Sequence, residues 1–323
     1  MGCFIGGETQ RKDNMNDRGL YYGSSEGSYK PREEIVKEMQ VFPDKKVPVV
    51  SYERITKHVQ EGDEIRKEMD VGQEDATWNI PLERQDRPAA AIWMTDMHYG
   101  HHATRNDLID KHLKMVEQTP NMFAIIGGDI IDNFSAAKHP VAATGDVVPP
   151  QIQAQAFMSR LRELDYKKKI GAFVFGNHED FINMAGYDFY QTFMQGLNAP
   201  VFNRGGILQA RLNNQLYRIG IGHKHWGVSK INPENAARRA MEFTYPNTDV
   251  VLLGDDHMAA GSAFTRGGER KIVIDGGTYK HDSTGQKWGL GKAGMGGYTL
   301  LLWPNRKHME FTHEPDVAQE LLR

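Results

Sequence analysis

The sequence is short of cysteine, of long hydrophobic runs and of excess charge of either sign. Its 323 residues contain one cysteine, Cys3, which excludes an internal disulfide framework and a zinc site made only of thiolates. No apolar run approaches the roughly 18 residues that a membrane span needs, and no segment has the apolar core of a secretory signal. We therefore expect a cytoplasmic, intracellular protein that has no membrane partner.

The balance of charge gives no sign of a protein that coats nucleic acid. Lysine and arginine number 39 against 42 aspartates and glutamates, so the net charge is -3 with the histidines neutral. A coating protein needs a broad basic field, whereas an enzyme that grips phosphate at one site does not. The composition disfavours the first class and leaves the second open.

Composition divides the chain into an acidic extension and a longer domain. Residues 1–87 are polar and show little apolar periodicity, so we expect an extension that is partly irregular with one or two short helices. This extension is also our candidate surface for forming a homo-oligomer. In residues 88–323 short apolar runs alternate with amphipathic segments, which is typical of an α/β domain with buried sheets.

The spacing of apolar residues predicts the elements of this domain. Apolar runs predict strands at 88–94, 122–126, 170–175, 216–221, 249–253 and 271–274. Helical spacing predicts helices at 106–118, 151–166 and 233–243. Two further runs, 298–303 and 308–312, flank Pro304 and Asn305 and predict a hairpin.

Five of these strands end in aspartate, asparagine or histidine, mostly beside glycine. In open α/β folds ligands bind outside the carboxyl ends of the strands, and glycine permits the tight turn there. Carboxylates, amide oxygens and imidazoles without thiolates suit Mn, Fe, Mg or Zn ions. The groups exceed what one ion needs, so they predict two ions that share a bridging carboxylate. The candidates are Asp96, His98, Asp129, Asn177, His178, His223, Asp255 and His257.

Taken in order, these strand ends resemble the five motifs of the calcineurin-like metallophosphoesterase superfamily over about residues 88–280. The first two motifs look closest to the branch that contains DNA-repair exonucleases and phage-encoded metallophosphoesterases. The resemblance implies a four-layer α-β-β-α sandwich, in which two sheets are flanked by helices. The segments that carry it are Asp96-x-His98, Gly128-Asp129, Gly176-Asn177-His178-Glu179, His223 and Gly254-Asp255-Asp256-His257.

The resemblance also implies a dinuclear metal site and a role for each motif residue. Manganese is our first choice for both divalent ions, with magnesium, iron, nickel and zinc as alternatives. His178 is expected beside the substrate as a catalytic residue that does not bind metal. The ligands implied for the first ion are Asp96, His98, Asp129 and His257. Those implied for the second are Asn177, His223 and Asp255, with Asp129 bridging.

Two positions depart from the family pattern or leave it ambiguous. The last motif of the family reads Gly-His-x-His, but Asp255 stands where the first histidine is expected. An aspartate there adds negative charge and favours harder cations such as Mn or Mg. In the fourth motif we prefer His223 over His225 as the ligand because His223 directly follows the apolar run. His225 and Lys224 then become candidates for binding the substrate.

The implied activity is that of a metal-dependent phosphoesterase, a hydrolase whose metal-activated hydroxide attacks phosphorus. His178 orients the phosphate or protonates the leaving oxygen, and Asp132 and Glu179 are candidates to orient imidazoles. We favour cleavage of phosphodiesters, with DNA or RNA as the substrate, over a protein-phosphatase activity. The reason is that the Arg-Gly of the protein phosphatases is missing after Asp132. Trp226 is a candidate for stacking a base, although we favour a packed tryptophan.

Two other functions stay open. One is a phosphatase or phosphodiesterase for small phosphate esters such as nucleotides, which the acidic composition favours. The other is a metal-binding scaffold with a weakened site, for which Asp255 is the support.

Overall fold

A computed structural model describes residues 51–53, 55–57, 59–61, 75–132, 147–179, 196–229, 231–281 and 295–323. Most of the predicted N-terminal extension lies outside this set, and the described part of 52–61 is helical. Residues Gly62–Arg323 form one compact unit, whose fold is given below. Within the described ranges, no helix has the length and apolar character needed to cross a membrane.

Two mixed sheets of six strands each form the centre of this unit. Sheet A contains, in spatial order, β1 (Asp75–Asn79), β6 (Gly205–Leu212), β7 (Gln215–Gly222), β8 (Val250–Leu253), β10 (Glu269–Asp275) and β9 (Ala260–Arg266). Sheet B contains β12 (Met309–Thr312), β11 (Tyr298–Leu302), β2 (Ala89–Met94), β3 (Met122–Gly127), β4 (Ile170–Val174) and β5 (Val201–Phe202).

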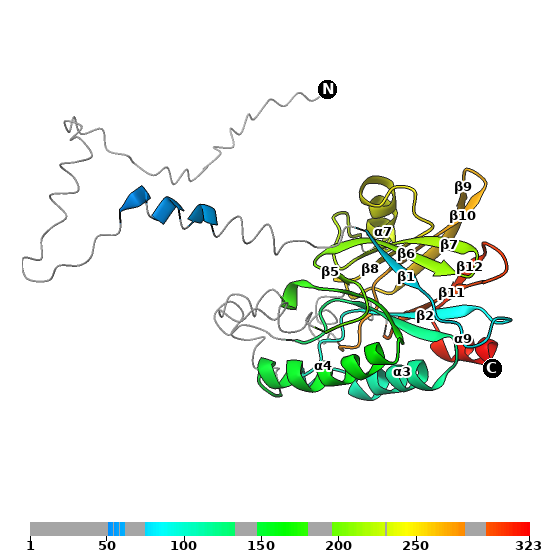
Figure 1. Cartoon of the computed structure of the whole chain (residues 1–323), viewed down its shortest axis with the longest axis horizontal. Helices are drawn as coiled ribbons and strands as arrows, with labels where there is room; N and C mark the ends of the chain where they lie inside the picture. Colours follow the sequence, from blue (N-terminus) through cyan, green and yellow to red (C-terminus); the bar gives the residue numbers. More distant parts are fainter. Residues whose placement is uncertain are drawn as a thin grey trace, which may run out of the picture. The chain divides into compact units, whose positions relative to one another are not determined.

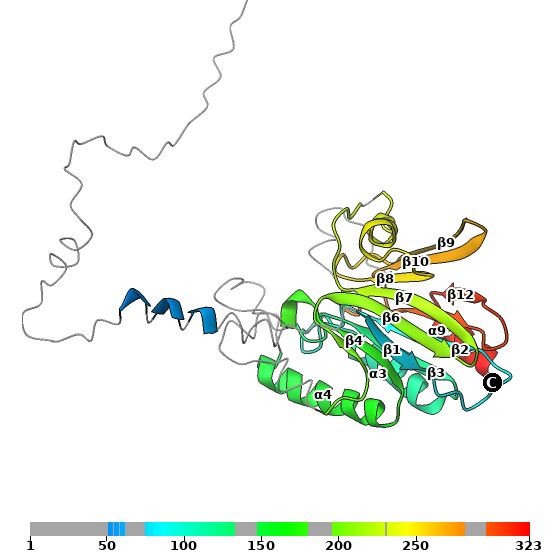
Figure 2. The same cartoon turned by 45° about the horizontal axis from the view of Figure 1, so that its top comes forward.

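Helices cover the outer face of each sheet. Sheet B is covered by α3 (Asn106–Gln118), α4 (Pro150–Tyr166) and α9 (Pro315–Leu322), as Figure 1 shows. Sheet A is covered by α7 (Asn235–Arg239), which continues into the π-helix η2 (Ala240–Thr244). Figure 2 shows α7 beyond β7 and β8, on the side away from α3 and α4. The predicted α-β-β-α sandwich is confirmed.

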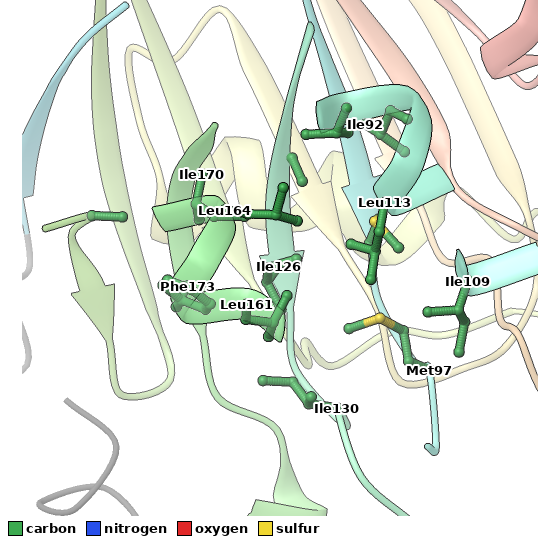
Figure 3. Packing of buried hydrophobic residues seen from close by; sticks show 14 of the residues in the cluster. Ile92, Met97, Ile109, Leu113, Ile126, Ile130, Leu161, Leu164, Ile170 and Phe173 are labelled. Carbon is green, nitrogen blue, oxygen red and sulfur yellow. The ribbon is translucent and has the colours of Figure 1, made fainter. Parts of the chain in front are cut away.

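Alternation along the strands divides the buried apolar side chains of the described residues into three cores: one between the sheets, a second between sheet B and its helices, and a third between sheet A and α7 with η2. In β2, Ala91 and Trp93 point into the core between the sheets, whereas Ile92 and Met94 point toward the helices. Figure 3 shows the second core, in which Leu113 of α3 and Leu161 of α4 lie over sheet B. Because both faces of β2, β3, β4 and β8 are buried, these strands read as continuous apolar runs rather than alternating ones.

The parallel strands bring their carboxyl ends to one edge of each sheet. β2, β3 and β4 run parallel in sheet B, and β7, β8 and β10 run parallel in sheet A. β1 pairs in parallel with β6, so a strand from the predicted extension belongs to sheet A. The predicted boundary between the extension and the domain, near residue 87, stays a prediction. Because β1 belongs to sheet A, the boundary is to be sought before residue 75.

A buried imidazole in α3 connects the stability of this fold to pH. His112 Nδ1 lies 2.8 Å from the Tyr279 hydroxyl, and burial lowers the pKa of His112 from 6.5 to about 4. The folded pKa lies below the unfolded one, so this stabilisation is complete above pH 6.5 and is lost as the pH falls toward 4. The loss corresponds to roughly 3 kcal/mol.

We expect His112→Gln to flatten the dependence of the unfolding free energy on pH between 6.5 and 4. Urea denaturation at several pH values in EDTA measures it. The control is His281→Gln, which removes an exposed imidazole and should leave the slope as it is. A slope that His112→Gln does not change would contradict the prediction.

Candidate metal centre

The structure brings the polar ends of five strands together where the two sheets meet. From sheet B come the residues after β2, β3 and β4, and from sheet A those after β7 and β8. Among the residues that the structure describes, three groups of side chains have ligand atoms within 4.8 Å of one another. These groups are Asp96, His98 and His257; Asp96, Asp129 and His223; and His98, Asp132 and His178.

The first group joins the ends of β2 and β8. His257 Nε2 lies 3.3 Å from Asp96 Oδ1 and 3.0 Å from His98 Nε2. Asp96 and His98 are buried, while His257 keeps partial exposure. One carboxylate and two imidazoles thus converge from the two sheets, which is a suitable donor set for a divalent cation.

Asp129 lies at the centre of the site. Its Oδ1 is 3.2 Å from His223 Nε2, and its Oδ2 is 3.6 Å from His178 Nε2 and 4.0 Å from His98 Nε2. The two oxygens of this buried carboxylate therefore face different partners. A carboxylate placed in this way could serve as a ligand to two neighbouring cations.

The buried carboxylate of Glu179 holds two of the motif turns in place. Glu179 accepts hydrogen bonds from the backbone N–H groups of Asp129 (3.0 Å), Ile130 (2.7 Å) and Gly176 (2.7 Å). Burial and the charge of Asp129 raise the pKa of Glu179 to about 7. The motif predicts that Glu179 orients an imidazole, whereas in the structure its side chain fixes two turns of the backbone.

Asp132 acts on the histidines. Its Oδ1 is 3.0 Å from His98 Nδ1 and 2.7 Å from Lys280 Nζ, and its backbone oxygen contacts His178 Nδ1. Asp132 thus orients the ring of His98 through its side chain and that of His178 through its backbone. Lys280 follows β10 with no motif around it, so the sequence alone does not point to it as part of the site.

Charges across the site offset the cost of burying it. Burial opposes ionisation of Asp96, yet the hydrogen bond from His257 and the nearby imidazolium charges hold its pKa below the ordinary value. Burial likewise opposes ionisation of Asp129, and the charges of His223 and His178 outweigh it to lower the pKa. For His98, burial lowers the pKa to about 4. The carboxylates are therefore ionised and His98 is neutral, the forms that bind cations. Against the effect of burial, the neighbouring carboxylates raise the pKa of His223 and of His257, so a cation has to displace a proton from each of these imidazoles.

The backbone at five of these positions is in the left-handed region. Side chains other than glycine rarely adopt positive φ, and each such residue costs on the order of 1–3 kcal/mol. Such conformations cluster at active sites, where the surrounding fold enforces them. The φ values are 52° for Asp96, 46° for His98, 47° for Asp129, 75° for Asp255 and 59° for His257.

Glycines allow the strand ends to approach one another. A Cβ on Gly254 would lie 2.2 Å from Thr95 Oγ1 and 2.8 Å from Asp96 Oδ2. A Cβ on Gly176 would lie 2.2 Å from Asp129 Oδ1. No side chain fits at either place, so glycine next to a ligand-type residue serves close packing of the site as well as the turn.

Two buried donor atoms support the presence of cations. Asn177 Oδ1 is shielded from solvent and accepts no hydrogen bond. His223 Nε2 is also shielded and has no hydrogen bond of good geometry, although Asp129 Oδ1 is 3.2 Å away. Buried polar atoms normally have partners, and a divalent ion would satisfy both. The described residues of the site therefore fit bound divalent metal ions, which their carboxylates, imidazoles and amide oxygen imply.

The remaining predicted residues lie at the margin of the site. Asp255 Oδ1 is 3.9 Å from His223 Nε2, while its Oδ2 pairs with Lys224 Nζ at 2.6 Å. His225 points elsewhere, because its ring nitrogens lie 2.9 Å from the Trp226 oxygen and 2.8 Å from Thr244 Oγ1. The geometry favours His223 over His225 as a ligand.

Comparison with known proteins defines the class to which this site belongs. A family model for the calcineurin-like phosphoesterases matches residues 91–259, just over half of the chain. The chain belongs to this family, and it is a metal-dependent phosphoesterase that hydrolyses phosphate esters with divalent ions. A comparison with curated proteins found no match.

Several solved structures are similar, at low identity. Vacuolar protein sorting 29 from Cryptosporidium parvum is 10% identical, covering 70% of this chain and 98% of its own, with a TM-score of 0.35. The nuclease MPE of Pseudomonas putida is 13% identical, covering 69% and 87%, with a TM-score of 0.30. A metallophosphoesterase from Sphaerobacter thermophilus is 13% identical, covering 72% and 93%, with a TM-score of 0.34. These values carry no argument about substrate.

Proposed function

We propose that the protein is a dinuclear phosphodiesterase whose main substrate is nucleic acid. The observation that carries the proposal is Asp129, whose two oxygens face histidines of both sheets at the shared strand edge. The choice of phosphodiester rests on the second motif, which continues to Asp132 without the Arg-Gly of the protein phosphatases. Lys224, an exposed cation beside Asp255, supports a substrate with a phosphate backbone.

The ligands of the two ions are part of the proposal. Asp96, His98 and His257 would hold the first ion, His223, Asn177 and Asp255 the second, and Asp129 would bridge. When bound, such ions supply Lewis acidity and an activated water for attack on phosphorus. We propose manganese because Asp255 replaces an imidazole with a harder oxygen donor.

The chain itself supplies proton transfer through His178. The carbonyl oxygen of Asp132 can only accept a hydrogen bond, so His178 Nδ1 carries the hydrogen. Nε2 then faces Asp129 and is the atom that takes up and returns a proton. The backbone contact holds the ring in this orientation, so His178 can protonate the leaving oxygen from a fixed position.

Asp255 allows a test of the second ion. We expect Asp255→His to lower the ratio of Mn- to Zn-supported turnover by about tenfold, because imidazole suits zinc better than a carboxylate does. Turnover with each metal in turn measures the ratio. The control is Asp107→His, which adds a histidine at an exposed position of α3. An unchanged ratio would mean that Asp255 does not bind metal.

One assay tests the substrate class. Turnover with added Mn is measured on single-stranded DNA, bis-p-nitrophenyl phosphate and p-nitrophenyl phosphate. Cleavage of DNA that depends on Asp129 supports the nuclease. Hydrolysis of the small esters alone would replace it with a nucleotide-scale phosphatase or phosphodiesterase.

The alternative is a scaffold protein that binds metal weakly and does not catalyse a reaction. The ion pair between Asp255 and Lys224 favours it, because Lys224 engages a carboxylate that is predicted to bind the second ion. Bound metal without turnover on any of the three substrates would support that alternative instead.

A further inference from the structure

Two aromatic residues shortly after His223 and one from η2 form an exposed row of rings. The row, here called the aromatic row, consists of His225, Trp226 and Phe243. Ring centres are 5.5 Å apart for His225 and Trp226 and 6.0 Å apart for Trp226 and Phe243, and both pairs are within 26° of parallel. Trp226 is 58% exposed and Phe243 is 68% exposed. Large aromatic side chains usually bury most of their surface, so folding does not account for this row.

Hydrogen bonds and an irregular helix fix the aromatic row. The two ring nitrogens of His225 are engaged by the Trp226 oxygen and by Thr244 Oγ1. Phe243 and Thr244 belong to η2, whose last turn is closed by the Tyr245 N–H donating to the Ala240 oxygen at 2.7 Å. π-Helical turns are rare and occur frequently at functional sites. The rings are thus held in place before any ligand arrives, which lowers the cost of binding.

Cations flank the aromatic row. The Arg239 guanidinium lies 4.6 Å from the centre of the Trp226 ring. Gly227, with a φ of 98°, permits this approach, because a Cβ there would lie 2.6 Å from Arg239 Cδ. On the side of the metal centre, Lys224 has a side chain that is 67% exposed. The exposed surface of Trp226 and Phe243 therefore lies next to the Arg239 guanidinium and to Lys224, whose Nζ is also paired with Asp255 Oδ2 at 2.6 Å.

The aromatic row is close to the metal centre. Trp226 is three residues from His223, so their Cα atoms are at most roughly 11 Å apart. His223 itself contacts Asp129. A chain of nucleotides whose phosphate reached the metal centre could place a neighbouring base on the row.

We propose that the aromatic row stacks unpaired bases of a single-stranded nucleic acid whose backbone passes Lys224 into the metal centre. Stacking platforms combined with cations bind single strands without sequence preference. In a duplex the base faces are already stacked on one another and are not available. This inference rests on the proposed nuclease function and narrows its substrate to unpaired strands.

The experiment separates stacking from attraction to phosphate. Binding is measured by fluorescence anisotropy with the Mn-loaded protein, using an oligothymidylate with phosphorothioate linkages and an abasic strand of equal length and charge. The wild type is expected to bind the base-containing strand more tightly. Trp226→Ala should weaken that binding by about tenfold and leave abasic binding unchanged. Trp226→Phe should retain most of the preference. The control, Tyr166→Ala, removes an exposed aromatic side chain at the end of α4 and should retain all of it.

Three results would overturn the inference. If the wild type cleaves DNA but binds both strands equally, the row does not stack bases and the nuclease function stands. If Trp226→Ala weakens the binding of both strands equally, the aromatic row contributes to binding without stacking on bases. If sedimentation shows self-association that Trp226→Ala removes, the row is a contact between copies of the chain. Failure of the wild type to cleave or bind any strand would instead refute the nuclease proposal itself.

Discussion

Asp129→Ala is expected to release both metal ions and to lower turnover by at least about a thousandfold. Its carboxylate faces His223 through one oxygen and His178 and His98 through the other, so under the proposed bridging role its removal would take a ligand from each ion. Loss of the ions removes several kcal/mol of transition-state stabilisation, and each 1.36 kcal/mol is tenfold in rate. The measurements are metal content after dialysis and turnover with added Mn.

Asp249→Ala is the matched control for this variant. Asp249 is buried to a similar degree, but it precedes β8, at the end of that strand opposite the metal centre. It contacts Lys271 and Lys307 rather than histidines. Asp249→Ala should keep its metal and its turnover in whatever fraction remains folded. Two ions still bound in Asp129→Ala would contradict the bridging role.

His178→Ala is expected to keep both ions and to lose about 10²- to 10⁴-fold in rate, the usual contribution of a general acid. Its Nε2 faces Asp129, yet the resemblance that identifies the motif assigns it no metal, and Nδ1 is tied to the Asp132 backbone. Metal content should therefore match the wild type. His308→Ala, which removes a half-buried imidazole next to β12, is the control.

The leaving group reveals which task His178 performs. Protonation matters most when the leaving oxygen is basic, so the deficit of His178→Ala should be large for an alkyl leaving group and small for p-nitrophenol. A deficit that is equal for both would assign His178 to orientation of the phosphate. Full turnover in His178→Ala would remove it from the catalytic residues altogether.

Much of the fold follows from local patterns in the sequence. The helix predicted at 106–118 coincides with α3, and the one predicted at 151–166 differs from α4 by one residue. Both have long amphipathic repeats, and the buried strands have apolar runs that end in glycine and polar residues. The order of these strand ends was enough to recognise the family, because parallel strands bring their carboxyl ends together.

Other features depend on contacts between distant parts of the chain. β1 has a single buried residue, Trp78, and becomes a strand by pairing with β6, far along the sequence. β6 begins with Gly205 and Gly206, which read as a turn in isolation. The prediction of a packed Trp226 is wrong, because 58% of its surface stays exposed beside Phe243 of η2. None of these contacts has a local signal.

Five residues of the site have a left-handed backbone, and at these positions thermal stability and catalysis favour different side chains. Glycine adopts positive φ at no steric cost, and asparagine tolerates it. Glycine or asparagine at Asp96, His98, Asp129, Asp255 or His257 would relieve the backbone while removing a proposed metal ligand. A library selected for thermal endurance alone would therefore accumulate inactive clones at these codons. Substitutions that raise thermal stability without loss of activity are therefore expected in the rest of the sandwich, while the backbone at the metal centre keeps its strained conformation.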